Sequence, residues 1–165
     1  MIDQTVLAAL NAQITKERQN AATYLALANR AGALNLTGVE KFMRQASAEE
    51  LTHAQILIEY VIDRGAEPIT ALVNAVILPP ALPMIAEPLA LFGAALSAEV
   101  ANTNALEVLR NAAATANDWR TSDVLIPMLA EQTASERELS EYVARLGAAG
   151  NDAAAVLAID AQLAE

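Results

Sequence analysis

Glu49-Glu50-Leu51-Thr52-His53 lies inside a long stretch with helical periodicity, and it decides how the rest of the chain is interpreted. Glu50 and the chain's only histidine, His53, are three residues apart, so they stack on one helical face. The other members of that face are Val39, Met43, Ala46, Leu57 and Tyr60. Burial of an unpaired carboxylate costs several kcal/mol. The pair therefore needs a compensating partner, and a metal ion is one candidate.

Three other stretches show the same pattern, an apolar stripe with a polar residue near its middle. Glu17, Glu99 and Gln132 are these polar residues, and Glu131 lies beside the last stripe. The stripes are Leu10, Ile14, Glu17, Ala21, Tyr24 and Ala28; Phe92, Leu96, Glu99, Thr103 and Leu106; and Leu125, Met128, Gln132, Ser135, Leu139 and Tyr142. Carboxylates that converge from three helices repel one another unless cations neutralise them. The conjunction favours a metal centre over a neutral polar core.

Start and stop signals divide the chain into four long helices and one short helix. We expect the helices over about 3–31, 37–64, 89–116, 121–146 and 152–163. Gly32 and Gly65 are expected to end the first two, and Pro127 is expected to bend the start of the fourth. Residues 66–88 contain five prolines and are too long for a tight turn. The order predicts a single all-α domain, 1–165, a four-helix bundle with one long crossover and a short fifth C-terminal helix.

Composition excludes several classes of function. The formal charge of −10 and the pI near 4.5 argue against a nucleic-acid partner, since phosphates repel such a surface. The chain has no cysteine, so a thiolate metal site and a disulfide framework are excluded. The most apolar region, 69–96, is interrupted by prolines and by Asn74 and Glu87, so no membrane span is expected. The N-terminus lacks the pattern of a signal peptide, and a cytoplasmic location is expected.

The ligand types indicate which metal would bind. Carboxylates with one imidazole and no sulfur favour iron or manganese. Glu50 can bridge two ions, one completed by Glu17 and His53 and the other by Glu99. Such sparse ligation leaves positions open for water or oxygen, and two Fe(II) ions can each give one electron to O2 or H2O2. Oxidation of Fe(II) is therefore the predicted reaction, and Tyr24 is expected to hydrogen-bond the site or supply an electron.

The chain resembles the haem-free bacterial ferritins over nearly its full length. The matching segments are Glu17-Arg18 with Tyr24, Glu49 to Ala54, Glu99, Glu131-Gln132 and Ala158 to Leu163. The resemblance implies a ferroxidase centre with Glu17, Glu50 and His53 around the first iron. It implies that Glu50 and Glu99 hold the second iron, with Gln132 nearby. It also implies a hollow shell, typically of 24 subunits, that stores oxidised iron as a mineral.

The chain departs from the family pattern around this centre. Many bacterial ferritins carry further carboxylates in the fourth helix that make a third iron site, and Ala134 and Ser135 stand there in this chain. Only Glu49 and Glu131 are left as candidate ligands of such a site. The threefold-channel carboxylates of animal ferritins fall on Ser122 and Leu125 in this chain, and Asp118 and Asp123 are the candidate substitutes.

Two alternative functions stay open. One is a di-iron redox enzyme that reduces O2 or peroxide in a small oligomer. The other is a shell subunit with little catalysis of its own. A haem-binding bacterioferritin is disfavoured because the haem-ligand methionine would fall at Leu51, so no haem is expected.

Overall fold

All regular structure in residues 2–165, which the computed structural model describes, is helical. The five helices are α1 (Gln4–Ala33), α2 (Thr37–Asp63), α3 (Glu87–Thr115), α4 (Trp119–Ala149) and α5 (Ala153–Ala164). None of the helices in this part of the chain is both long and apolar enough to span a bilayer. The predicted all-α fold, with four long helices and a short fifth one, is confirmed.

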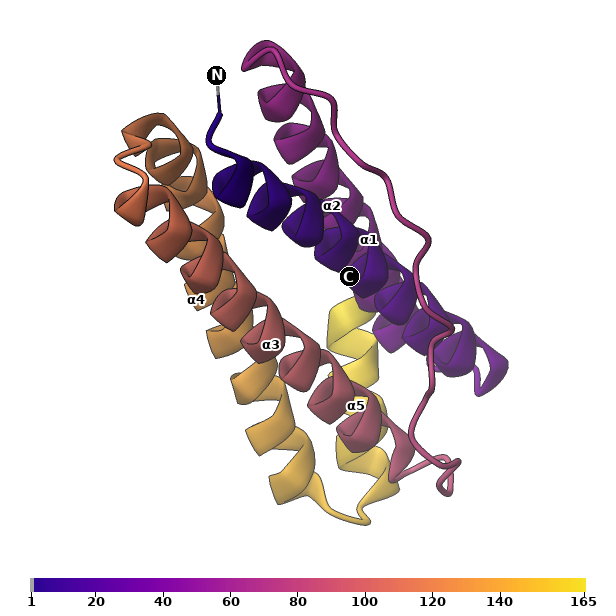
Figure 1. Cartoon of the computed structure of the whole chain (residues 1–165). Coiled ribbons are helices and arrows are strands. Elements are labelled where there is room, and N and C mark those ends of the chain that lie inside the picture. Colours follow the sequence, from indigo (N-terminus) through magenta and orange to yellow (C-terminus); the bar gives the residue numbers. More distant parts are fainter. Residues whose placement is uncertain (1) are drawn as a thin grey trace.

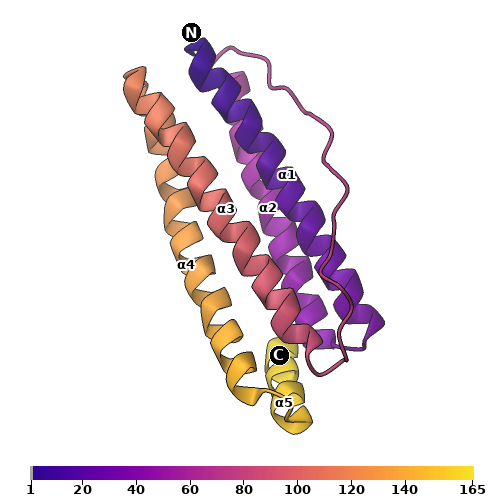
Figure 2. The ribbon, with the colours of Figure 1, turned by 60° about the horizontal axis from the view of Figure 1, so that its bottom comes forward.

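The four long helices pack as two antiparallel pairs (Figure 1). α1 packs along α2, α3 packs along α4, and contacts between α1 and α3 join the pairs. Between α2 and α3 the chain runs back along the bundle as an extended crossover, and α5 lies at the end where α2 and α3 begin (Figure 2). This connectivity matches the predicted bundle with one crossover.

The crossover is held to α1 by hydrogen bonds between α1 side chains and the crossover's main chain. Each bond joins an α1 side chain to a crossover peptide group: Asn11 to Ile69 N at 2.8 Å, Gln19 to Asn74 N at 2.6 Å, Arg18 to Ala71 O at 2.6 Å and Arg30 to Pro79 O at 2.8 Å. The crossover's own side chains take no part in these bonds. Leu72 and Ile77 are 93% exposed.

Four predicted helix boundaries were wrong by two or three residues: the end of α1, the start of α3 and both ends of α4. α3 begins at Glu87 rather than near residue 89, and α4 continues to Ala149 rather than ending near residue 146. α1 does not end at Gly32 but continues to Ala33, and the chain reverses at Asn35, whose φ is 57°. Asparagine tolerates the left-handed conformation better than most residues, which explains the displaced stop. α4 begins at Trp119, two residues earlier than predicted, because Asp118 caps it by accepting a hydrogen bond from Thr121 N at 3.3 Å.

α5 docks on the N-terminal end of α2. The first N–H groups of a helix have no partner within it, and here buried Asp160 accepts a hydrogen bond from Val39 N at 2.8 Å. Lys41 adds a bond to Ala164 O at 2.9 Å. At Gly38 a Cβ atom would lie 1.8 Å from the carbonyl oxygen of Asp160, so only glycine fits this contact.

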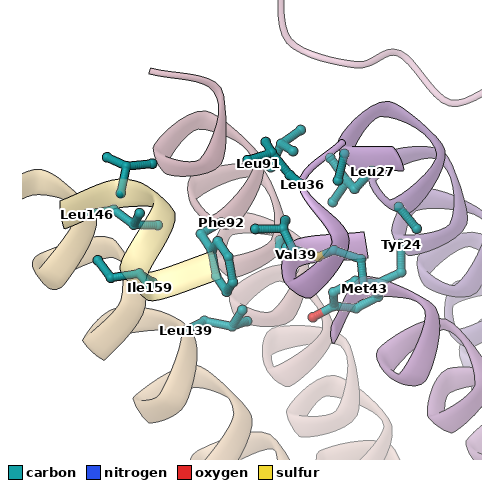
Figure 3. Packing of buried hydrophobic residues seen from close by; sticks show 14 residues of the cluster. Tyr24, Leu27, Leu36, Val39, Met43, Leu91, Phe92, Leu139, Leu146 and Ile159 are labelled. Atoms are coloured by element: carbon teal, nitrogen blue, oxygen red, sulfur yellow. The ribbon is translucent and has the colours of Figure 1, made fainter. Parts of the chain in front are cut away.

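Two apolar cores fill the bundle. The core nearer α5 draws on all five helices, and Figure 3 labels ten of its members: Tyr24, Leu27, Leu36, Val39, Met43, Leu91, Phe92, Leu139, Leu146 and Ile159. The core towards the other end contains Ile2, Val6, Leu10, Ile14, Leu57, Val61, Leu106, Leu109, Leu125 and Met128. On all four long helices the residues between these two sets include the polar members of the predicted stripes. A buried polar layer therefore separates the cores.

Candidate metal centre

A cavity of about 240 Å³ adjoins the polar layer, and Glu50, Glu99 and Gln132 of that layer line it. The side chains of Glu17, Glu50 and Glu99 are at most 4% exposed, and they come from α1, α2 and α3. The cavity is lined by Tyr24, Phe42, Gln45, Ala46, Glu49, Glu50, His53, Glu99, Gln132, Ser135, Glu138 and Leu139. The structure thus brings the carboxylates singled out in three helices to one level of the bundle.

Glu17, Glu50 and His53 form the tightest group. Each offers one ligand atom, and these atoms all lie within 4.8 Å of one another. His53 Nδ1 and Glu50 Oε2 are 3.8 Å apart, and neither buried atom has a hydrogen-bond partner within residues 2–165. Buried polar atoms in native structures are nearly always paired. A divalent cation between these lone pairs would satisfy both, and the donor set suits iron or manganese.

Glu99 faces the same cavity but is held by neutral donors. The Tyr24 hydroxyl donates a hydrogen bond to Oε1, and Gln132 Nε2 donates to Oε2 at 2.7 Å. Burial, reinforced by the charge of Glu99, raises the pKa of Tyr24, so its hydroxyl stays a donor. Glu99 therefore lies outside the tightest group, with both carboxylate oxygens already oriented.

Three buried amides complete the polar layer, and the sequence analysis missed them. Gln13 Nε2 donates to Glu17 Oε1 at 2.7 Å, Asn102 Nδ2 donates to Glu17 Oε2 at 3.0 Å, and Asn20 Nδ2 donates to Glu50 Oε1 at 3.3 Å. Gln13 also donates to Asn102 Oδ1 at 2.7 Å. Gln13 and Asn20 lie four before and three after Glu17, and Asn102 lies three after Glu99. That spacing places each amide on the same helical face as a predicted carboxylate, and it was the sequence signal that could have identified them.

The carboxylates hold protons more tightly than usual. Burial raises the pKa of Glu17 to about 9, and its hydrogen bond with Glu50 and the charge of Glu50 add to this. Burial also raises the pKa of Glu50 to about 7; the bond with Glu17 works against this increase and the charge of Glu99 adds to it. The pair therefore retains at least one proton near neutral pH, and a bound cation has to displace it.

We expect the metal-free protein to lose stability as the pH rises. The folded-state pKa values of Glu17 and Glu50 lie above the ordinary value of 4.5, so the folded state binds more protons than the unfolded state. This stabilisation is complete below about pH 4.5. It is lost as Glu50 releases its proton near pH 7 and Glu17 near pH 9. The contribution of Glu50 alone is on the order of 3 kcal/mol. Thermal melts from pH 5 to 9, with and without Zn²⁺, measure the loss.

Glu50→Gln should flatten this pH dependence below about pH 7. Glu141→Gln is the matched control because Glu141 is exposed and lies far along α4. A flat or rising stability of the metal-free wild-type protein over the same window would contradict the buried-carboxylate explanation.

The outer predicted ligands lie at the mouth of the cavity. Glu131 is 61% exposed and its Oε2 lies 2.7 Å from His53 Nε2, on the ring edge opposite Glu50. Glu49 is exposed and lines both the inner cavity and an outer pocket of about 390 Å³. The outer pocket is lined by Glu49, Thr52, His53, Ile56, Glu131, Ala134 and Ser135. His53 therefore stands between the buried carboxylates and the outside.

Asp118 does not form an open acidic site. Arg64 binds it through two parallel hydrogen bonds, Nη1 to Oδ1 at 3.0 Å and Nη2 to Oδ2 at 3.1 Å. Burial opposes ionisation here, but the bonds from Arg64 and Thr121 outweigh it and lower the pKa of Asp118. Its carboxylate is committed to Arg64 and to capping α4, so its use as a channel ligand is disfavoured.

A bundle with one crossover, whose four long helices each add a polar side chain to one buried centre, defines the ferritin-like class of proteins. The model of the ferritin-like domain family matches residues 7–148. The chain belongs to the ferritin family and is a protein of the iron-storage type.

Relatives and solved structures agree with this placement. The chain is similar to a ferritin heavy chain of Aedes aegypti, with 33% identity over 88% of this chain and 71% of the relative. It is 27% identical to a bacterial non-heme ferritin of Bacteroides fragilis, over 100% and 99% of the two chains. An open pore ferritin from the archaeon Archaeoglobus fulgidus superposes with a TM-score of 0.92 at 30% identity, covering 99% and 98%. A ferritin of the green alga Ulva pertusa gives 0.92 at 30%, covering 98% and 84%.

Proposed function

We propose that this chain oxidises Fe(II) to Fe(III) at a di-iron ferroxidase centre inside each subunit. The subunits are proposed to form a shell, of 24 copies by resemblance to the family, that stores the ferric mineral in the cytoplasm. The observation that carries the proposal is a pair of unpartnered atoms, Glu50 Oε2 and His53 Nδ1. They lie 3.8 Å apart within the buried group formed by Glu17, Glu50 and His53. A neutral polar core would pair those atoms with each other or with neighbours.

The chain's own groups have distinct roles in this proposal. Fe(II) is the substrate, and two bound Fe(II) ions supply two electrons to O2 or H2O2. Glu17, Glu50 and His53 hold the first ion, and Glu50 and Glu99 hold the second. Glu17 and Glu50 release their proton as the ions bind, which makes binding tighter at higher pH.

Buried amide side chains hold the proposed carboxylate ligands in place. Gln13 and Asn102 fix both oxygens of Glu17, and Gln132 orients Glu99. The two apolar cores lie on either side of the layer. Glu49 and Glu131, at the mouth, are proposed to meet ions that pass between the outer pocket and the centre.

Anaerobic addition of Fe(II) tests the proposal. We expect about two tight sites per subunit, followed by rapid oxidation when air is admitted. A crystal soaked in Fe(II), with anomalous scattering, counts and places the ions. The absence of tight binding at Glu50 would refute the centre. Mass from size-exclusion chromatography separates a shell from the small oligomer of a di-iron redox enzyme.

Tyr24→Phe separates the two roles considered for the tyrosine. The buried hydroxyl holds Glu99 Oε1, so we expect Fe(II) affinity at the second site to fall by about tenfold, as for other groups that orient a ligand. The first site should keep its affinity. If Tyr24 instead supplies an electron, oxygenation of the wild-type protein should give a tyrosyl signal in electron paramagnetic resonance that the variant lacks, with binding unchanged.

A further inference from the structure

The His53 ring lies between the carboxylates of Glu131 and Glu50, and only one of its two nitrogens is within hydrogen-bond distance of a carboxylate. On one edge Nε2 is 2.7 Å from Glu131 Oε2, a hydrogen-bond distance. On the other edge Nδ1 is 3.8 Å from Glu50 Oε2, too far for a hydrogen bond. His53 Nδ1 is also buried without a partner among residues 2–165.

This geometry selects one form of the ring. A neutral imidazole has one N–H and one lone pair, and an ionised carboxylate can only accept. The short contact to Glu131 therefore places the hydrogen on Nε2, because a lone pair there would face the lone pairs of the carboxylate. Nδ1 is left as a lone pair that faces the Glu17–Glu50 cluster, where a cation ligand is needed.

We propose that Glu131 is a positioning residue that fixes the Nε2–H tautomer and the orientation of His53, so that Nδ1 is presented to the metal. The inference rests on the proposed function only in naming Fe(II) as the ion. A carboxylate on the far nitrogen also makes a histidine a stronger ligand. At the centre itself Glu131 thus acts through His53, in addition to the contact with passing ions proposed for it at the mouth.

His53 borders the outer pocket, where Glu131 is the partner of its Nε2 atom. Thr52 directs its hydroxyl hydrogen to Ala48 O at 3.1 Å, so it does not donate to a lone pair on Nε2, and position 134, one turn along α4, is an alanine. Within residues 2–165, Glu131 is the one group at hydrogen-bond distance from Nε2. Because the Glu131 side chain is 61% exposed, replacing it leaves both apolar cores untouched.

Nitrogen-15 NMR of the metal-free protein tests the tautomer directly. The single histidine gives one pair of ring-nitrogen signals, and two-bond couplings to the ring protons identify the nitrogen that carries hydrogen. At a mildly alkaline pH, at which free imidazole is neutral, the wild-type protein should show Nε2–H. Glu131→Gln keeps an acceptor and should keep this form. Glu131→Ala should shift the ring towards Nδ1–H, because Glu50 Oε2 becomes the nearest acceptor.

Zn²⁺ binding to the same variants gives a second readout without redox chemistry. Glu131→Ala should weaken the His53 site by about 10–100-fold, Glu131→Gln should weaken it less, and the exposed control Glu141→Ala should leave it unchanged. An Nδ1–H wild-type ring, an unchanged tautomer in Glu131→Ala or an unchanged Zn²⁺ affinity would each overturn the inference. Normal NMR and Zn²⁺ results with no Fe(II) oxidation would instead refute the proposed function.

Discussion

Glu50→Gln is expected to abolish both Fe(II) sites and the rapid phase of Fe(II) oxidation. Glu50 is the one ligand shared by the two proposed sites, and one of its oxygens is the unpartnered atom that faces His53. Loss of a group that only orients a metal ligand costs about 10–100-fold in affinity or activity, so loss of the shared ligand should cost more than about 100-fold. Anaerobic Fe(II) titration and stopped-flow oxidation in air measure the two effects.

The substitution separates metal binding from folding. Glutamine is close in shape to glutamate and still accepts the hydrogen bond from Asn20. Since it removes a buried charge, metal-free Glu50→Gln should be at least as stable as the wild-type protein above pH 7. Glu59→Gln, at an exposed position on α2, is the matched control and should bind and oxidise iron normally. Two tight sites in Glu50→Gln would show that the centre lies elsewhere.

Gly38→Ala should lower the thermal stability more than any other single methyl addition at a glycine of this chain. The new Cβ would lie 1.8 Å from Asp160 O and 2.9 Å from Ala164 N, and both are backbone atoms of α5. α5 has to shift, which breaks the bond between Asp160 and Val39. Overpacking costs about 1–3 kcal/mol and a lost helix cap about 1 kcal/mol. A loss of about 3 kcal/mol lowers the Tm by about 6–12 °C in a chain of this size.

Gly93→Ala is the control for this experiment. Gly93 also lies within a helix, and a Cβ there meets nothing within 4 Å. Alanine is favoured over glycine in a helix by about 1 kcal/mol, so this variant should gain slightly in stability. Calorimetry gives both Tm values, and faster amide exchange in residues 153–164 of Gly38→Ala would locate the damage in α5. Equal melting of the two variants would contradict the docking contact.

Periodicity was enough to predict the bundle and the level of its polar layer. Glu17, Glu50 and Glu99 stood out because each interrupts an apolar stripe, and burial follows from the stripe. To predict that these three carboxylates meet, one further assumption was enough. The middles of neighbouring antiparallel helices had to lie at the same height in the bundle. The metal that they hold and its chemistry stay predictions.

Local chemistry was harder to predict from sequence. Amides such as Asn102 were missed because asparagine and glutamine are common on exposed faces, and only the fold shows that this one is buried. The role of Glu131 depends on the side of the His53 ring that it meets, which side-chain spacing does not specify. The stop at Gly32 failed because Asn35 takes the left-handed conformation instead.

The crossover has a consequence for the redesign of this chain. Its path over α1 is specified by two peptide N–H groups, which every amino acid except proline presents, and by two peptide carbonyls, which every amino acid presents. The bonds that hold it therefore do not depend on the identity of residues such as Leu72 and Ile77, whose side chains point to solvent. Substitutions at these outward positions therefore leave the anchoring bonds unchanged as long as the four α1 side chains are kept. The crossover is thus anchored on α1 independently of the side chains that it exposes on the single subunit.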